Sequence, residues 1–290
     1  VTGREGIYWV HNDSGDRARI LAMKEDGAIV AEVAVQGAAA TDWEDIAIGA
    51  GPLPAGPFPP GSAASTPPPA ATEPIAEAIK APRLFLFLAD TGNNDRSRKQ
   101  LVVWRIPEPE IASVPAARQA VLKLESQPAV AIRFRYPGGT HDCEAMVVHP
   151  GTGKIYLLTK AVFRSKVFRI DGTVAGGKDG AAPVQTAEEV AEMSPGFMVT
   201  AADISRDGRR LILRTYLQVQ EYRLPDGAAF EEIFLQPKIV LPSNLLEVQG
   251  EAICFAHDGR SIITVSEAKP KVIHKITRAE PGRSQERPPK

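Results

Sequence analysis

Short runs of apolar and β-branched residues recur along the chain, and turns that contain glycine separate them. The first three runs lie at residues 7–11, 19–23 and 29–35, with Asp-Ser-Gly at 13–15 and Glu-Asp-Gly at 25–27 between them. Runs of this kind are typical of short β-strands joined as hairpins. The pattern does not alternate between strands and helices, so we expect an all-β fold rather than an α/β fold.

The later strands group into four further units of similar construction. We expect strands at 44–49, 83–89, 101–106 and 129–136 in the second unit; at 144–148, 154–160 and 166–170, with a less regular segment to 193, in the third; at 202–205, 211–216, 219–223 and within 231–240 in the fourth; and at 251–255, 262–266 and 272–276 in the fifth. Such units, repeated every ~40–60 residues, are typical of propeller blades. We predict a β-propeller of five blades, each a four-stranded antiparallel sheet, with six blades as the alternative.

One strand in each of the four later units has a similar sequence. Residues 41–49 read Thr-Asp-Trp-Glu-Asp-Ile-Ala-Ile-Gly, and the alignment of the four strands places Glu44, Glu144, Ala202 and Glu251 at one position. Because side chains alternate across a strand, each glutamate shares a face with the large apolar residue two places on. The first unit lacks this strand, so either residues before Val1 or the tail would complete the ring. If the repeated strand lines the central channel, three glutamates meet near the axis.

A cation would resolve the repulsion between these carboxylates. Three of them together would otherwise force at least one to keep its proton. Ca²⁺ takes about six to eight oxygen ligands in irregular geometry, so we predict a channel site for Ca²⁺, with Mg²⁺ as the alternative. The predicted ligands are Glu44, Glu144, Glu251, Asp45, Asp142 and Asp203, with Asp42 close by. The other interpretation is that these side chains bind channel waters and backbone amides.

Polar residues follow the second strand of several units. Asp-Ser-Gly at 13–15 aligns with Asp-Thr-Gly at 90–92, and each directly follows an apolar strand. Turn chemistry alone explains the aspartates and glycines, but it does not explain the cluster of histidine and asparagine beside them. We predict a ligand-binding collar on one rim of the ring, made of His11, Asn12, Asp13, Asp90, Asn93, Asn94, His141, Lys160, Arg214, Tyr216 and Glu267.

Composition sets two segments apart from the propeller. Residues 51–82 are rich in Pro, Ala, Gly and Ser, which bury too little apolar surface to become ordered, so we expect a surface insertion there. We expect the charged, Pro-rich tail at 280–290 to be disordered as well. This leaves one propeller domain over residues 1–279.

Charge, hydropathy and cysteine content limit the partners and the cellular location that we expect. With 34 basic and 35 acidic residues, the chain gives no electrostatic reason to expect nucleic acid or a polybasic membrane anchor. No apolar run approaches the ~18–20 residues of a membrane span. The abrupt start at Val1 suggests a trimmed chain, so we expect a periplasmic or secreted monomer. Cys143 and Cys254 lie in repeats separated by a whole unit, and we expect buried free thiols.

Five sequence segments resemble those of known propeller proteins. They are Trp-Val-His-Asn-Asp-Ser-Gly at 9–15, Asp-Trp-Glu-Asp-Ile-Ala at 42–47, Asp-Thr-Gly-Asn-Asn at 90–94, His-Asp-Cys-Glu-Ala at 141–145 and Gln-Gly-Glu-Ala-Ile at 249–253. In them the chain resembles a broad group of bacterial, mostly exported and uncharacterised propellers. It is more loosely similar to the phytase-like propellers, a likeness that implies Ca²⁺ ions and a water attacking a phosphate held by Lys160 or Arg214.

The sequence contains no nucleophile elbow, P-loop, dinucleotide fingerprint or His-Glu-x-x-His motif, so it lacks the signatures of the commonest hydrolase, NTPase and zincin classes. We expect an exported binding or scaffold propeller with a channel cation, and with a small-molecule or protein ligand at the channel mouth. The alternative is a calcium-dependent phosphoesterase or related hydrolase. A third interpretation is a purely structural module of a larger assembly.

Overall fold

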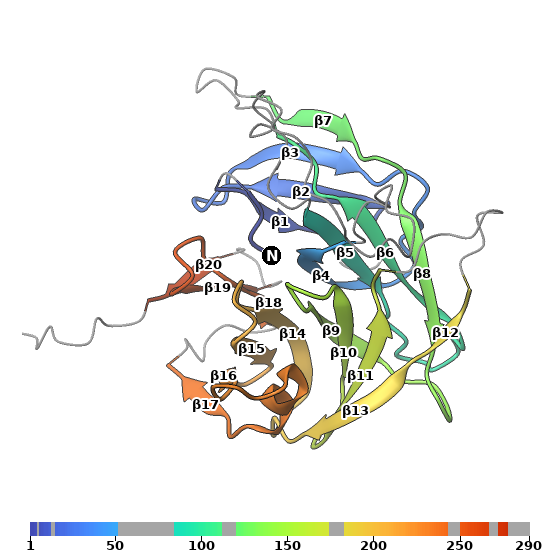
Figure 1. The fold of residues 1–290 in the computed structure, drawn as a ribbon. Helices are drawn as coiled ribbons and strands as arrows, with labels where there is room; N and C mark the ends of the chain where they lie inside the picture. The colour runs from blue at the N-terminus through green and yellow to red at the C-terminus, as the bar shows by residue number, and fades with distance from the viewer. Residues whose placement is uncertain are drawn as a thin grey trace, which may run out of the picture.

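The chain folds as a ring of five β-sheets, which confirms the predicted five-bladed propeller (Figure 1). The computed structural model describes residues 1–4, 6–12, 15–51, 84–111, 120–173, 183–242, 250–266 and 272–277. The predicted insertion beyond residue 51 and the predicted tail at 280–290 lie outside these residues. No helix within the described ranges is long and apolar enough to cross a membrane.

The blades follow one another in chain order, and their strands pair mainly antiparallel. Blade 1 consists of β1 (Tyr8–Val10), β2 (Arg19–Met23), β3 (Ile29–Ala34) and β7 (Leu122–Glu125); blade 2 of β4 (Trp43–Ala50), β5 (Leu84–Asp90), β6 (Leu101–Pro107), β8 (Val130–Arg135) and β12 (Gln185–Thr186). Blade 3 consists of β9 (Cys143–Val148), β10 (Lys154–Thr159), β11 (Ser165–Asp171) and β13 (Glu188–Met193); blade 4 of β14 (Val199–Ile204), β15 (Arg210–Thr215), β16 (Val219–Arg223) and β17 (Ile239–Leu241); blade 5 of β18 (Gly250–Phe255), β19 (Ile262–Ser266) and β20 (Ile273–Ile276). Strands β4, β9, β14 and β18 lie around the centre of the ring (Figure 1).

Blades 1 and 2 each carry an added outer strand that the sequence pattern did not predict. Strand β7 belongs to the second sequence unit but pairs in parallel with β3 of blade 1. Strand β12 belongs to the third sequence unit but pairs in parallel with β8 of blade 2. Each strand therefore ties a blade to the sequence unit that follows it. Both are short, at four and two residues, and each lies apart from the hairpins of the unit that it pairs with, which explains why the pattern missed them.

The strand predicted within 231–240 is replaced by two elements. The 3-10 helix η2 (Phe230–Leu235) comes first, and the short strand β17 follows. The helix buries Ile233 and Phe234, and the ring of Phe234 lies 5.3 Å from that of Tyr156 in blade 3. Packing between blades 3 and 4 therefore favours a helical turn where the sequence alone favoured a strand.

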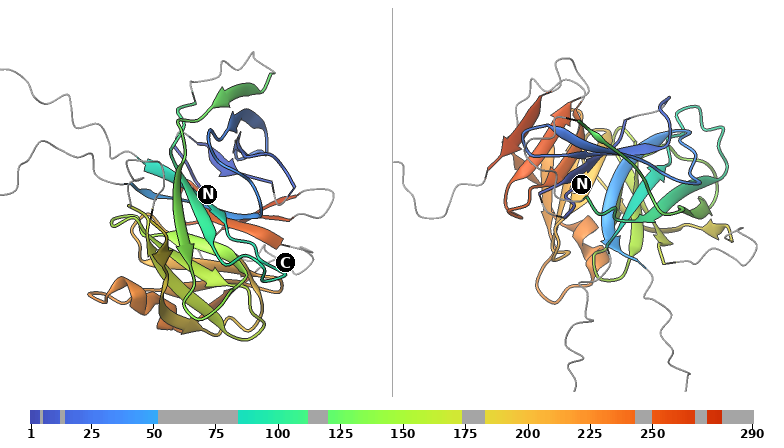
Figure 2. Two further views of the ribbon diagram at one scale, coloured as in Figure 1. Left: turned by 90° about the vertical axis from the view of Figure 1, so that its right-hand side faces the viewer. Right: turned by 90° about the horizontal axis from the view of Figure 1, so that it is seen from above.

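Apolar side chains pack between neighbouring blades and close the ring. A separate buried cluster lies at each of the five interfaces between blades. The interface of blades 1 and 2 contains Trp9, Trp43 and Trp104, which act as packing anchors. The interface of blades 5 and 1 includes Met23 and Ile263, and these two blades lie side by side in Figures 1 and 2. The ring is therefore continuous.

Both cysteines are free and buried, as the sequence predicted. Cys143 lies in β9 and Cys254 in β18, so blade 4 separates them. Burial raises the pKa of Cys143 to about 12 and that of Cys254 to about 11. A thiol that stays protonated at neutral pH is a poor nucleophile and a poor metal ligand, so both cysteines act as small core residues.

Candidate functional site

The central strands of blades 2 to 5 each carry a β-bulge at the same place. In β4, Trp43 and Asp45 pair with consecutive residues of β5, which makes Glu44 the extra residue of the bulge. The corresponding extra residues are Glu144 in β9, Thr200 in β14 and Glu251 in β18. A bulge redirects the side chain of the extra residue away from the regular alternation of the strand. The same device thus orients one residue from each of four blades.

The structure corrects the sequence alignment in blade 4. The alignment placed Ala202 at the glutamate position, but the bulge lies two residues earlier, at Thr200. Ala202 is buried between blades 3 and 4, whereas Thr200 Oγ1 donates a hydrogen bond to the carbonyl of Gly250 over 2.9 Å. A shared Asp-Ile pair misled the alignment, because the bulge is set by pairing with β15 and not by local sequence.

The four bulged residues line one cavity of about 1200 Å³ at the centre of the ring. Glu44, Glu144, Thr200 and Glu251 reach it from blades 2 to 5, and residues of blade 1 such as Trp9 complete the wall. The structure therefore brings together three glutamates that are far apart in sequence. Thr200 is a lining residue that sequence reasoning missed.

Acidic side chains dominate the charge of this cavity. Its lining includes seven of them, namely Asp16, Glu25, Asp26, Glu44, Asp45, Glu144 and Glu251. Among the described lining residues Lys275 is the only lysine or arginine, and its amine pairs with Glu25 at 2.6 Å. The whole chain has a formal net charge of −1, so this acidity is local. The acids of blade 1 gave no signal in the sequence beyond an ordinary Glu-Asp-Gly turn.

A chain of polar contacts joins Glu144 to Glu251 across two blades. Lys160 forms an ion pair with Glu144, and its amine lies 5.5 Å from the ring centroid of Tyr216. The hydroxyl of Tyr216 donates to Glu251 Oε1 over 3.5 Å. Burial by itself lowers the pKa of Lys160, but the hydrogen bond and charge of Glu144 outweigh it and raise that pKa. Lys160 is therefore a fixed positive charge beside Glu144, and Tyr216 lies between it and Glu251.

Gly92 leaves room for two carboxylates in blade 2. A Cβ atom at this position would overlap the Oε1 atom of Glu44 and the Oδ2 atom of Asp42. Both acidic side chains therefore close over the backbone of the loop that follows β5. These two predicted metal-site residues therefore approach one point.

Asp45 and Asp203 join neighbouring blades through backbone amides. Asp45 accepts hydrogen bonds from the N–H of Ile46 and from the N–H of Met146 in blade 3, both over 2.8 Å. Asp203 accepts from the N–H of Ile204 and from that of Phe255 in blade 5, also over 2.8 Å. Burial raises the pKa of Asp45 to about 7 and that of Asp203 to about 6. Both side chains, predicted as metal ligands, have both oxygens in hydrogen bonds: one oxygen binds within its own strand and the other binds the neighbouring blade.

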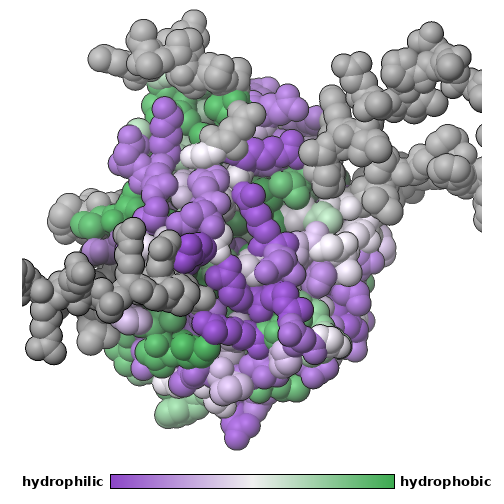
Figure 3. Space-filling view, turned by 60° about the vertical axis from the view of Figure 1, so that its left-hand side comes forward, coloured by the Kyte–Doolittle hydropathy of each residue, from purple (hydrophilic) through white to green (hydrophobic). Residues whose placement is uncertain are grey.

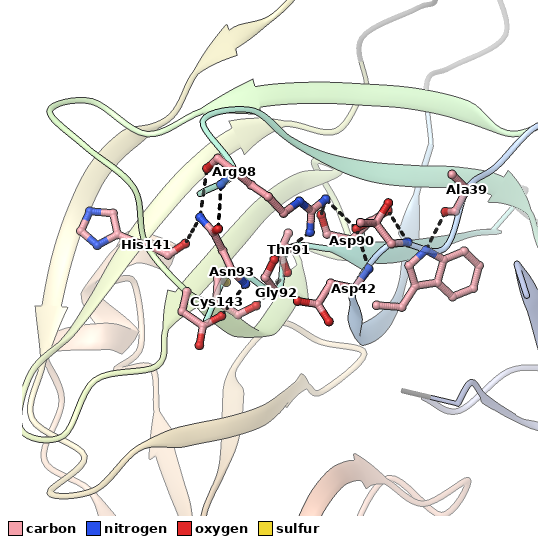
Figure 4. A network of polar contacts seen from close by, with 12 residues as sticks. Ala39, Asp42, Asp90, Thr91, Gly92, Asn93, Arg98, His141 and Cys143 are labelled. Carbon is pink, nitrogen blue, oxygen red and sulfur yellow. Dashed lines mark hydrogen bonds and ion pairs between the residues drawn. The ribbon is translucent and has the colours of Figure 1, made fainter. Parts of the chain in front are cut away.

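Asp90 and Asn93 hold the loop after β5 in place (Figure 4), and Asn93 joins it to Asp142 at the start of blade 3. Asp90 pairs with Arg98 at 2.7 Å and accepts from the N–H of Asp42 over 3.1 Å. The N–H of Asn93 donates to Asp142 Oδ1 over 2.8 Å, and its side chain bonds the backbone of Arg98. The polar atoms of these predicted ligand-binding and metal-binding residues therefore fix the rim internally.

His141, Asn94 and Arg214 do not line the cavity. The ring of His141 packs between those of Tyr136 and Phe168, with centroids 5.0 and 5.1 Å away, and burial lowers its pKa. Asn94 is exposed on the loop after β5. Arg214 is buried, and its guanidinium fills the space that a Cβ atom at residue 250 would occupy.

Of the remaining predicted collar residues, two line the cavity and two lie outside the described residues. His11 and Asn12 line the cavity, and the ring of His11 lies 6.1 Å from that of Trp43. The side chain of Asn12 donates to Asp16 Oδ2 over 2.7 Å. Asp13 and Glu267 lie outside the described residues. The predicted collar is therefore partly cavity wall and partly internal scaffold.

The described part of the chain contains no group of three or more histidine, cysteine, aspartate or glutamate side chains arranged to hold a metal ion. The three glutamates line one cavity without converging on one point, and Lys160 already binds Glu144. Glu44 lines the cavity, and Asp42, which is not a lining residue, approaches Gly92 beside it, so these two carboxylates form a pair at the edge of the channel.

The fold and the site define the class: a five-bladed β-propeller with an acidic cavity at its axis. No protein-family model and no curated protein sequence matches the chain. Among solved structures, the periplasmic gluconolactonase PpgL of Pseudomonas aeruginosa is similar with a TM-score of 0.39 and 11% identity, over 95% of this chain and 68% of that one. The Cps50 (Swd1) propeller domain of Myceliophteria thermophila gives 0.39 and 10%, over 90% and 82%. A putative 6-phosphogluconolactonase from Bacteroides uniformis gives 0.37 and 9%, over 92% and 63%. Likenesses this distant say nothing about the activity of the chain.

Proposed function

We propose that this propeller is a binding protein that takes a cationic ligand in its channel cavity. The observation that carries the proposal is the charge of the lining, which holds seven acids and one lysine. Three of these acids form ion pairs, namely Asp16 with Arg19, Glu25 with Lys275 and Glu144 with Lys160, and the acids still outnumber these cations. A cleft lined by one sign of charge raises the local concentration of ligands of the opposite sign. Because the chain as a whole is nearly neutral, the cavity is where this attraction is concentrated.

A divalent cation, Ca²⁺ first and Mg²⁺ second, is the simplest such ligand. Carboxylate oxygens are the ligands that these hard cations prefer. Glu44 and Asp42 would supply the first oxygens, since both close over Gly92. Glu144 would join them only if Lys160 moved away, so occupancy by a cation would be coupled to the position of that lysine.

Isothermal titration calorimetry on chelator-treated protein tests the divalent-cation form of the proposal. We expect heat on addition of CaCl₂, a rise in melting temperature, and at least 10-fold weaker binding in Glu44→Gln. The matched control is Glu189→Gln, which removes an exposed carboxylate paired with Lys166 on blade 3 and should bind as the parent protein does. Absence of heat and of any melting shift with both Ca²⁺ and Mg²⁺ would contradict it.

The phosphoesterase alternative has less support from the cavity. A phosphate would face seven acidic side chains there, whereas phosphoryl chemistry needs cations beside the developing negative charge. Turnover of an aryl phosphate with Ca²⁺, abolished in Glu144→Gln, would favour the enzyme over the binding protein. Equal background rates in all samples would remove it. Export to the periplasm or outside the cell stays a prediction from sequence.

A further inference from the structure

The cavity has a second wall that the glutamates do not explain. Apolar residues of blades 1 and 5 line it, namely Leu21, Met23, Ile29, Ile263, Val265 and Ile273. Leu21 and Met23 are two residues apart in β2, and Ile263 and Val265 are two apart in β19, so each pair shares one face of its strand. These two faces meet at the junction that closes the ring. The cavity is thus acidic at the bulged strands and apolar at the junction of blades 5 and 1.

The composition of this wall follows from how blade 1 is built. The Asp-Ser-Gly segment after β1 makes this strand the counterpart of β5, the second strand of blade 2. On its other edge, the described residues contribute an isolated bridge between Thr2 and Tyr8 rather than a bulged strand with a glutamate. In the described residues, the sector next to blade 5 presents the faces of β2 and β19 to the cavity.

Volume argues against an inorganic ion as the whole ligand. Pockets for small molecules measure about 300–1,000 Å³, and this cavity, at about 1200 Å³, reaches beyond that range. A single ion at the glutamates would leave the apolar wall facing water. Figure 3 views the molecule from the side of blades 1 and 5, where hydrophilic residues surround separate apolar patches. The cavity lining itself combines acidic and apolar residues, so both kinds of surface are available to one ligand.

We propose that the ligand is an amphipathic organic cation, with its ammonium head at the channel glutamates and its apolar body against the wall formed by β2, β19 and β20. This inference rests on the proposed function and names the class of its ligand. The glutamates select the positive charge and reject anions with the same tail. The apolar wall selects the tail, because each buried methylene group contributes to binding.

Three probes of matched structure separate head from tail. Octyltrimethylammonium carries both, tetramethylammonium carries the head alone, and octanoate carries the tail with the opposite charge. Titrations of the full chain at low salt, below micelle-forming concentrations, should give at least 10-fold tighter binding of octyltrimethylammonium than of either other probe. Added NaCl should weaken it, because salt screens the attraction of the glutamates. Equal affinity for octanoate, or for tetramethylammonium, would overturn the proposal.

Two variants test which wall of the cavity binds the head of the ligand and which binds its tail. Glu251→Gln should weaken the binding of octyltrimethylammonium at least 10-fold, because the ammonium head loses one carboxylate partner. Val265→Asn, a substitution at a half-buried wall position, should weaken it at least 5-fold while leaving Ca²⁺ titrations unchanged. If Val265→Asn does not fold, as judged by circular dichroism, Leu21→Gln in blade 1 tests the same wall. Unchanged affinity in a folded wall variant would overturn the proposal.

The outcomes separate this inference from the proposed function. Binding of Ca²⁺ without binding of octyltrimethylammonium would overturn this inference alone and leave the cation-binding propeller in place. Binding of octyltrimethylammonium without Ca²⁺ would support the inference and contradict the divalent-cation form. Failure of every cation to bind would overturn both.

Discussion

At the scale of single residues, carboxylates from one repeated strand take unlike roles. Glu44 and Glu144 lie at bulges and face the cavity. Asp45, directly after the first bulge, accepts two backbone N–H groups. Asp203 also accepts two backbone N–H groups. It lies three residues after the bulged Thr200, whereas Asp45 lies one residue after the bulged Glu44. Position relative to the bulge, rather than residue type, decides whether an acid faces the channel or joins two blades.

Asp45 should make stability depend on pH. Its folded pKa, about 7, lies above the ordinary value of 3.8, so its contribution is full below pH 4 and is lost as pH rises towards 7. We expect the free energy of unfolding to fall over this range, by up to about 1.4 kcal/mol per pH unit for one such group. Asp45→Asn should be less stable than the parent protein below about pH 4, by about 1–3 kcal/mol, because one amide loses its acceptor, and this difference should shrink as pH rises towards 7. Its pH dependence should also be shallower.

Urea denaturation at half-unit pH steps checks this expectation. Asp258, whose pKa is shifted in the opposite direction, serves as the control. Hydrogen bonds from Ser261 and from the N–H of Arg260 outweigh desolvation and lower the pKa of Asp258 to about 2. Its contribution is present above about pH 4 and is lost as pH falls towards 2, so Asp258→Asn should flatten the curve only on the acid side. An Asp45→Asn curve parallel to that of the parent protein would contradict the role assigned to Asp45.

Gly92→Ala should weaken cation binding without unfolding the protein. The new Cβ atom would displace the carboxylate ends of Glu44 and Asp42, and the ends of flexible side chains move at small cost. We expect a change in stability of about 1 kcal/mol or less, typical of a tolerated substitution, and at least 10-fold weaker Ca²⁺ binding by calorimetry. Gly151→Ala, in the turn between β9 and β10, is the control and should bind normally. Equal Ca²⁺ affinities in the two variants would show that Gly92 does not belong to the cation-binding site.

At the scale of elements, the central strands work as a set because they are bulged in register. Each bulge changes the face of the residues beyond it, so one strand lines the channel at its start and packs between blades further on. Threonine hydroxyls link these strands at the rim: Thr91 donates to the carbonyl of Cys143 over 2.8 Å, and Thr200 to that of Gly250. The residues directly before Glu144 and Glu251 are therefore held by hydrogen bonds from the preceding blade.

Close packing of β4 on β9 predicts a large cost for one added methyl group. A Cβ atom at Gly49 would overlap the side chain of Val148, which is buried between blades 2 and 3. Overpacking of this kind costs about 1–3 kcal/mol, so Gly49→Ala should lower the urea midpoint clearly. In Gly151→Ala the nearest neighbouring atom is 3.5 Å away, an ordinary contact, and the change should stay within about 0.5 kcal/mol. Equal midpoints would show that the two strands are not held this tightly.

At the scale of the whole molecule, the junction of blades 5 and 1 closes the ring. Thr2 Oγ1 bonds the carbonyl of Phe255, and the rings of Tyr8 and His257 meet edge to face at 4.7 Å. Ile263 belongs to the buried cluster at this junction and also lines the cavity. The proposed apolar wall is therefore part of the closure, so ligand binding should stabilise the closed ring.

Ile263→Ala should destabilise the whole ring rather than one blade. Removing a buried isoleucine costs about 2–5 kcal/mol, and the low end applies here because the cavity already borders the side chain. We expect one cooperative urea transition with a lower midpoint and an unchanged slope. Lys275→Gln removes an exposed ion pair with Glu25 at the same junction and should change stability by less than about 1 kcal/mol. A second, separate transition in Ile263→Ala would show that blade 5 unfolds alone.

The sequence by itself determined the five strand units, the propeller class and the strand that carries Glu44, Glu144 and Glu251, since apolar alternation and turn glycines are local signals. Only the tertiary structure decided that Thr200 takes the fourth channel position, because a bulge is defined by pairing with another strand. It also decided that Lys160 binds Glu144 and that the faces of β2 and β19 form an apolar wall. Those contacts join residues far apart in the chain, and they exist only once the ring has closed.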